Sequence, residues 1–172
     1  MRSTRNLDYM RILVFTEGTL IMHKCGLGQS REQIVMQSIE GKDSSLYDWK
    51  SYIPVGNAVQ KLNAWKSQGA QILYLTSRRL SADVETIRGV LRKCGFPEGQ
   101  LLYRQGNEEY KDVAEKAMPQ IIVEDDCESI GGENQMTFTN LKPELKKKIK
   151  LITVEEFGGI DHLPDRVDDL VG

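Results

Sequence analysis

The sequence predicts a three-layer α/β/α domain, Rossmann-like in type, built on a parallel sheet. Three apolar runs, at residues 11–15, 71–75 and 120–123, have the composition of strands that are buried on both faces. Segments with helical spacing of apolar residues separate these runs, and this alternation is typical of a parallel sheet with helices on both sides. The length of 172 residues suits a single domain spanning residues 1–172.

Capping and stop signals give the limits of the helices. Ser30 and Gln33 have the spacing of a capping box, and Gly41 follows as a stop. Ser81 is expected to cap another helix, which Gly95 ends. The predicted helices cover residues 31–39, 55–66, 81–95, 108–118 and 143–150, and further strands are predicted at 100–103, 136–138 and 151–154.

Composition excludes some classes of partner. The net charge is −2 and the pI is about 5.8, so there is no bulk positive field to hold nucleic acid or an anionic membrane. The polar start of the chain and the short apolar run after it fit neither a secretory signal nor a membrane span. We therefore expect a cytoplasmic protein with no membrane partner, whose three separated cysteines stay reduced.

Polar or acidic residues follow each of the three apolar runs. They are Thr16–Thr19 after the first run, Thr76–Arg78 after the second, and Glu124–Asp126 after the third. In open α/β sheets, ligands bind beyond the carboxyl ends of the strands. The sequence therefore predicts that these three segments meet at one site.

These segments resemble the motifs of the haloacid dehalogenase superfamily, whose members are mostly magnesium-dependent phosphatases and phosphotransferases. Its first motif, Asp-x-Asp-Gly-Thr after an apolar strand, is matched by Phe15–Thr19. The second, a strand that ends in Thr or Ser, is matched by Thr76, and the third, a lysine before the last motif strand, by Lys111. The fourth, an acidic strand end, is matched by Glu124–Asp126, and the four motifs occur in the family's order.

The resemblance extends from about residue 10 to residue 132. Residues 21–53 fall where the family inserts its cap, and they are few. This implies a minimal cap and an open site, which in the family often goes with bulky or macromolecular substrates. Within the insertion, the polar residues 43–52 with their scattered aromatic side chains predict a small helix or loop.

Phe15 stands where the family carries its nucleophilic aspartate. The resemblance implies that this aspartate attacks phosphorus, forms an aspartyl-phosphate and ligates Mg²⁺. A phenyl ring has no lone pair for the attack and no oxygen for Mg²⁺, which prefers oxygen ligands. Ordinary aspartyl-phosphate chemistry is therefore not expected.

The other motif residues could still form a site. Glu17 is either the family's acid/base carboxylate, one methylene longer, or a solvated turn residue, whereas strand alternation predicts that Thr16 points away from it. Asp125, and next to it Asp126, are the expected ligands of a weakened Mg²⁺ site, since adjacent buried carboxylates repel one another without a cation. His23 could enter the site from the short insertion, but neither it nor His162 carries a spacing signature, and a packing or surface role is expected for both. The expected phosphate-binding residues are Gly18, Thr19, Thr76, Ser77, Arg78 and Lys111.

The sequence is compatible with three functions. The first is a degenerate phosphatase site that binds a phosphate-bearing ligand, small or macromolecular, without ordinary catalysis. The second is a divergent metal-dependent phosphoester hydrolase in which Glu17 activates water. The third is a non-catalytic interaction domain. The sequence alone does not decide whether the protein is an enzyme.

Overall fold

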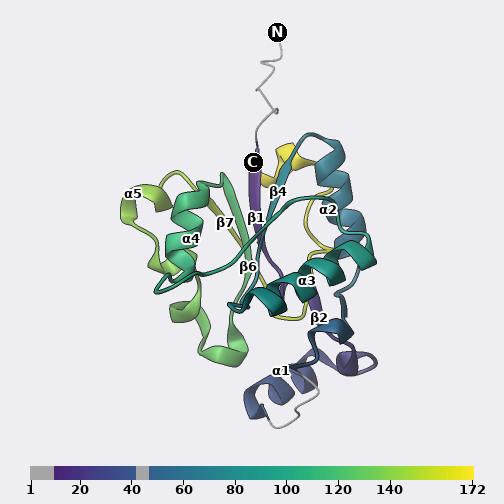
Figure 1. Cartoon of the computed structure of the whole chain (residues 1–172). Coiled ribbons are helices and arrows are strands. Elements are labelled where there is room, and N and C mark those ends of the chain that lie inside the picture. Colours follow the sequence, from purple (N-terminus) through teal and green to yellow (C-terminus); the bar gives the residue numbers. More distant parts are fainter. Residues whose placement is uncertain (1–9, 42–46) are drawn as a thin grey trace.

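The computed structural model describes residues 10–41 and 47–172, and a five-stranded sheet lies at its centre (Figure 1). All neighbouring strands are parallel, in the order β5-β4-β1-β6-β7, which confirms the predicted sheet. The strands are β1 (Arg11–Phe15), β4 (Gln71–Leu75), β5 (Gln100–Leu102), β6 (Ile121–Asp125) and β7 (Lys150–Val154).

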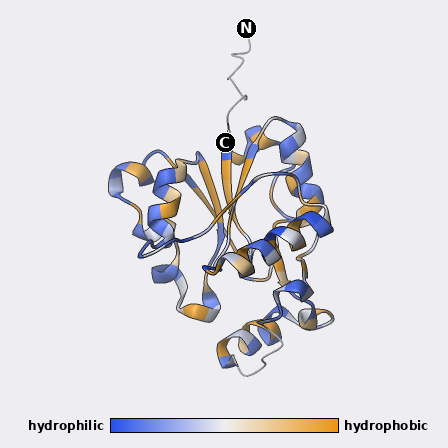
Figure 2. Cartoon of the chain, viewed as in Figure 1, coloured by the Kyte–Doolittle hydropathy of each residue, from blue (hydrophilic) through white to orange (hydrophobic). Residues whose placement is uncertain are grey.

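Helices cover both faces of this sheet (Figure 1). On one face lie α2 (Ala58–Ser67) and α3 (Ser81–Cys94), and on the other lie α4 (Tyr110–Ala117) and the single turn α5 (Pro143–Lys146). Figure 2 shows the strands as the most hydrophobic part of the chain. Successive side chains of β1 enter opposite cores, because side chains alternate along a strand and both faces are covered.

The insertion after β1 begins and ends in a small antiparallel sheet. Its strands β2 (Ile21–His23) and β3 (Tyr52–Pro54) pair His23 with Tyr52. Between them lies α1 (Arg31–Glu40), which carries the predicted capping box at Ser30 and ends at Gly41 in the left-handed conformation. The prediction for residues 43–52 falls partly outside the described residues, and within the rest a short 3-10 helix covers Trp49–Ser51.

The third apolar run extends further than the sequence predicts. Strand β6 includes Glu124 and Asp125, because both pair with β7. The predicted strand at 136–138 is wrong, since the backbone amides of Thr137 and Phe138 each donate to the Glu124 carboxylate at 2.9 Å and Phe138 begins a 3-10 turn. A buried acid thus organises this segment in place of strand pairing.

Helix boundaries differ from the predicted ones in detail. The helix expected from residue 55 begins at Ala58, and Ser81 is the first residue of α3, with Leu80 in the capping position. The helix expected at 143–150 is only the four residues of α5, since β7 already begins at Lys150. Among the described residues, no helix has the length and apolar character that crossing a bilayer requires.

Candidate functional site

A cavity of about 490 Å³ lies where the carboxyl ends of the strands meet the insertion. Residues from all five strand ends or the loops after them contribute to its lining, together with residues of the insertion. Six residues of the site predicted from the sequence are among them: Phe15, Glu17, Gly18, Ser77, Arg78 and Asp125. The prediction that the strand-end segments meet is therefore confirmed.

Charge is distributed across the sheet edge in the order of the strands. Arg104 follows β5 and Arg78 follows β4, so both guanidinium groups lie on one side. Asp125 ends β6 and Glu156 follows β7, so the carboxylates lie on the other side. Phe15, at the end of the central strand β1, stands between the two groups.

The phenyl ring of Phe15 packs against α4. Its edge-to-face contact with Tyr110 has ring centroids 5.6 Å apart, and both side chains are partly buried against the core on that face. The guanidinium of Arg104 in turn lies 3.9 Å from the centroid of the Tyr110 ring. Phe15 is thus a packing residue at the end of the central strand.

Hydrogen-bond donors surround the carboxylate of Glu17. Thr76 Oγ1 donates to Oε1 at 2.6 Å, and the backbone amide of Ser77 donates to Oε2 at 3.1 Å. Arg78 Nε lies 3.6 Å from Oε1. The hydroxyl of Thr16 also donates to this carboxylate, so the prediction that Thr16 points away is wrong; β1 ends at Phe15, and strand alternation does not continue beyond it.

Thr19 and Gly18 support the acidic side of the cavity. Thr19 is fully buried, and its Oγ1 donates to Asp125 Oδ2 at 2.8 Å. Gly18 has φ +84°, and a Cβ there would lie 3.0 Å from the same Asp125 oxygen. Glycine therefore allows the turn to approach this carboxylate closely. The hydroxyls of Thr19 and Thr76 are both directed at carboxylates, and neither residue lines the cavity.

Asp125, Asp126 and Glu156 form an acidic cluster in which one carboxylate oxygen from each lies within 4.8 Å of the others. Burial raises the pKa of Asp125 and of Glu156, and the neighbouring carboxylates add to both shifts. Arg31 of α1 forms ion pairs with Glu128 and with Asp126, the latter at 3.8 Å. Among the described residues, neither Asp125 nor Glu156 forms an ion pair.

Lys111 is not part of this cavity. Its ammonium lies 3.0 Å from Glu109 on the surface of α4, and the residue is absent from the cavity lining. Arg104 brings a positive charge to the cavity instead, and it donates to the Ser77 carbonyl at 3.2 Å. Burial lowers the pKa of Arg104, so a neighbouring anion would stabilise its charged form.

Three buried side-chain polar atoms within the described residues have no hydrogen-bond partner: His23 Nε2, Arg104 Nε and Thr137 Oγ1. All three belong to residues that line this one cavity. Buried polar groups in folded proteins are normally paired, so unpaired ones mark a place where a ligand or water completes the hydrogen bonding. The expectation that His23 has only a packing role does not account for its unpaired nitrogen.

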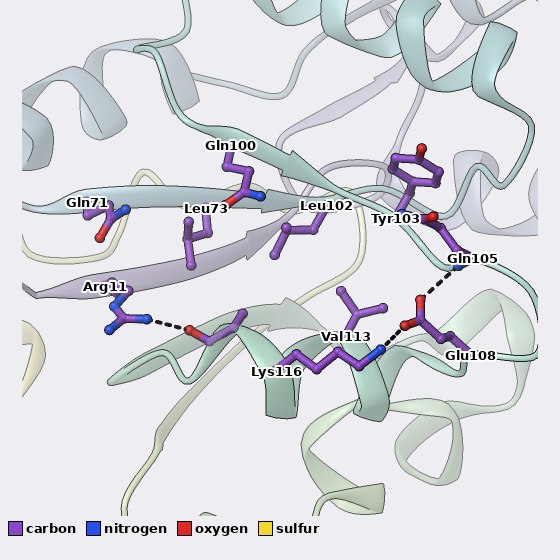
Figure 3. A pocket seen from close by; sticks show the side chains of 11 residues that line it. Arg11, Gln71, Leu73, Gln100, Leu102, Tyr103, Gln105, Glu108, Val113 and Lys116 are labelled. Atoms are coloured by element: carbon purple, nitrogen blue, oxygen red, sulfur yellow. Dashed lines mark hydrogen bonds and ion pairs between the residues drawn. The ribbon is translucent and has the colours of Figure 1, made fainter.

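A second cavity, of about 410 Å³, lies beside α4 and strands β1, β4 and β5 (Figure 3). Its charged groups are paired: Arg11 donates to the Ala117 carbonyl at 2.8 Å, and Glu108 binds both Lys116 and the Gln105 amide. The unpaired donors are in the first cavity, and we therefore place the candidate site there.

Several residues of the cavity lining were not predicted from the sequence, although two of them directly follow predicted strands. Arg104 follows the strand predicted at 100–103, and Glu156 follows the strand predicted at 151–154. The rule that ligands bind beyond strand ends applies to these outer strands as it does to the inner three. No comparable signal pointed to Trp49 or Tyr52, because residues 43–52 have no regular pattern.

No model of a known protein family matches the chain, and no curated protein sequence matches it either. Solved structures do match. A class C acid phosphatase from Bacillus anthracis with tungstate bound has a TM-score of 0.55 at 14% identity, covering 87% of this chain and 68% of that chain.

Two structures of Pnkp1/Rnl/Hen1 assemblies also match, one of them an RNA repair complex. Their TM-scores are 0.53 and 0.54 at 14% and 16% identity, and each alignment covers 88% of this chain. The chain spans 47% and 43% of the matched chains, less than half their length. At these identities the likeness shows the fold, which is the α/β architecture predicted from the sequence.

Proposed function

We propose that this protein binds a phosphate-bearing ligand in the cavity at the strand ends, without ordinary aspartyl-phosphate catalysis. One observation carries the proposal: the cavity lining combines Arg78 and Arg104, buried side chains with unpaired polar atoms, and two carboxylates of the acidic cluster, Asp125 and Glu156. In this proposal the chain keeps the ligand-binding role of a haloacid dehalogenase-like domain, and residues 21–53 serve as its minimal cap.

The phosphate would lie toward Arg78 and Arg104. Guanidinium groups bind phosphate through paired, charge-assisted hydrogen bonds, and Arg104 still has an unpaired Nε. Ser77 completes this side of the cavity. In this proposal Arg104 supplies the positive charge beside the phosphate that the family motif assigns to Lys111.

The resemblance also implies Mg²⁺, and the acidic cluster fits a divalent cation. Asp125, Asp126 and Glu156 offer three carboxylates close together, two of them with a pKa raised by burial. Phe15 removes one oxygen ligand that the family supplies, so the affinity should be low. When bound, the cation would neutralise phosphate charge.

Two features favour binding over hydrolysis. Phe15 cannot form a covalent intermediate. Three donors already bond to the Glu17 carboxylate, Thr76 to Oε1 and Ser77 and Thr16 to Oε2, and these bonds lower its basicity toward a water. Thr16, Thr76 and Ser77 thus hold the carboxylate as a structural acceptor beside the ligand.

The test combines binding with turnover on the same purified chain. Inorganic phosphate should bind in the presence of Mg²⁺ by calorimetry, and 4-nitrophenyl phosphate should not be hydrolysed above the blank. If turnover occurs and Glu17→Gln abolishes it, the divergent hydrolase replaces our proposal. If neither phosphate nor the ester binds, the interaction domain is the remaining function.

A further inference from the structure

The imidazole of His23 is held in one orientation and carries an unused donor. The side chain is only 7% exposed, and its Nδ1 accepts a hydrogen bond from the Cys25 amide at 3.2 Å. A ring nitrogen that accepts from an amide is unprotonated, so in the neutral ring the proton is on Nε2. Nε2 is buried, and within the described part of the chain it has no hydrogen-bond partner.

His23 lies at the end of the cavity formed by the insertion. It contacts Tyr52 edge to face with centroids 5.7 Å apart, and Tyr52 packs on Trp49 at 5.6 Å. Arg78 also lies over the Trp49 ring, with its guanidinium carbon 3.9 Å from the ring centroid. A row of aromatic rings therefore separates the His23 imidazole from the guanidinium that faces the proposed phosphate.

The lining near His23 differs in character from the lining near Arg78. Besides the aromatic rings it contains Gly26 and the buried Ile34. Such a surface suits a flat, weakly polar group, and a single buried donor selects an acceptor at a defined place on it.

We propose that His23 determines specificity by donating from Nε2 to the organic part of the ligand. Resting on the proposed function, this identifies the ligand class as a phosphomonoester whose organic group is planar and bears a hydrogen-bond acceptor. The phosphate lies toward Arg78 and Arg104, and the organic group extends along Trp49 and Tyr52 to His23.

The first measurement uses the unmodified chain. It has two histidines, so His162→Phe assigns the imidazole nitrogen resonances of both. His23 should be the Nε2–H tautomer, and its Nε2 resonance should shift with an aryl phosphate that bears an acceptor, but not with inorganic phosphate. An Nδ1–H tautomer, or a resonance that no aryl phosphate moves, would overturn the inference.

The second measurement compares phenyl phosphate with its 2-, 3- and 4-carbamoyl derivatives by calorimetry. At least one derivative should bind about tenfold tighter than phenyl phosphate, the gain expected when a buried donor finds an acceptor. His23→Phe should abolish this gain, and His23→Gln, which keeps a donor, should retain part of it. His162→Phe is the matched control and should change nothing.

The outcomes separate the inference from the proposal on which it rests. If inorganic phosphate binds but no derivative gains affinity, or the gain survives His23→Phe, His23 has no role in specificity and the proposed function stands. If neither inorganic phosphate nor any aryl phosphate binds, both are wrong. Should His23→Phe fail to fold, the tautomer and titration data on the unmodified chain decide.

Discussion

The ring of Tyr110 lies edge-on against Phe15, with centroids 5.6 Å apart and planes inclined by 68°. This contact joins the central strand to α4 at the position where the resembling family has its nucleophile. The guanidinium of Arg104 lies over the face of the Tyr110 ring. Phe15 therefore takes part in an aromatic contact that supports the cationic side of the cavity.

Phe15→Asp should restore a ligand for Mg²⁺ while weakening the fold. Loss of the half-buried ring and of its contact with Tyr110 should lower the free energy of unfolding by about 2 kcal/mol without metal. Mg²⁺ should then bind more tightly than to the unmodified chain, as measured by calorimetry. Phe15→Asn, of the same size but neutral, is the control. Equal Mg²⁺ affinity of the two variants would show that the acids at this edge do not form a cation site.

Arg104→Met should weaken the binding of inorganic phosphate. A charge-assisted hydrogen bond is worth about 1.5–3 kcal/mol, so the dissociation constant should rise by roughly tenfold or more. Lys111→Met, at the position of the family motif, should leave it unchanged because Lys111 pairs with Glu109 outside the cavity. If a phosphate titration shows that Lys111→Met weakens binding more than Arg104→Met does, Lys111 is the phosphate-binding residue, as the motif implies.

Thr76→Val should destabilise the chain through Glu17. The hydroxyl of Thr76 donates to the Glu17 carboxylate at 2.6 Å, and its removal leaves a largely buried acceptor with one donor fewer. We expect a loss of about 1–3 kcal/mol in urea denaturation. Thr86→Val removes an exposed hydroxyl that bonds to the Ala82 carbonyl in α3, and should cost much less. Equal losses in the free energy of unfolding would mean that the bond to Glu17 stabilises the fold no more than an exposed hydrogen bond does.

The contribution of Glu124 to stability should fall as the pH rises toward neutrality in the absence of metal. Burial raises the pKa of Glu124 from 4.5 to about 7, so the folded chain holds this proton where the unfolded chain releases it. The stability is fully present below the unfolded value and declines between about pH 4.5 and 7, by at most about 3 kcal/mol. Glu124→Gln should flatten this slope in urea denaturation with EDTA, whereas Glu85→Gln, on the surface of α3, should not. An unchanged slope in Glu124→Gln would contradict the assignment.

Much of the fold followed from the sequence because its signals are local. The run at 71–75 has four buried apolar residues in succession, and the capping box at Ser30 is satisfied within its own helix. The failure at 136–138 has a long-range cause. Its amides bond to Glu124, a residue more than ten positions earlier, and no local pattern reveals that.

The site could be predicted where strand order alone determines it. Residues after β1, β4 and β6 meet because parallel strands end at the same edge of a sheet. Lys111 matches the motif by its position in the sequence. The motif does not determine the direction of its side chain, which pairs with Glu109 outside the cavity. The sequence indicates that His23 could enter the site but not what it does there, since that depends on burial and on the partner of each ring nitrogen.

The most direct test of non-covalent phosphate binding at the strand ends is a crystal structure of the protein soaked with phosphate and Mg²⁺. We expect a phosphate within hydrogen-bond distance of Arg78 and Arg104, next to Phe15, with no covalent bond to the protein. An empty cavity, with phosphate bound only elsewhere, would contradict the proposed binding site. A phosphoryl group attached to a side chain would contradict the absence of covalent catalysis.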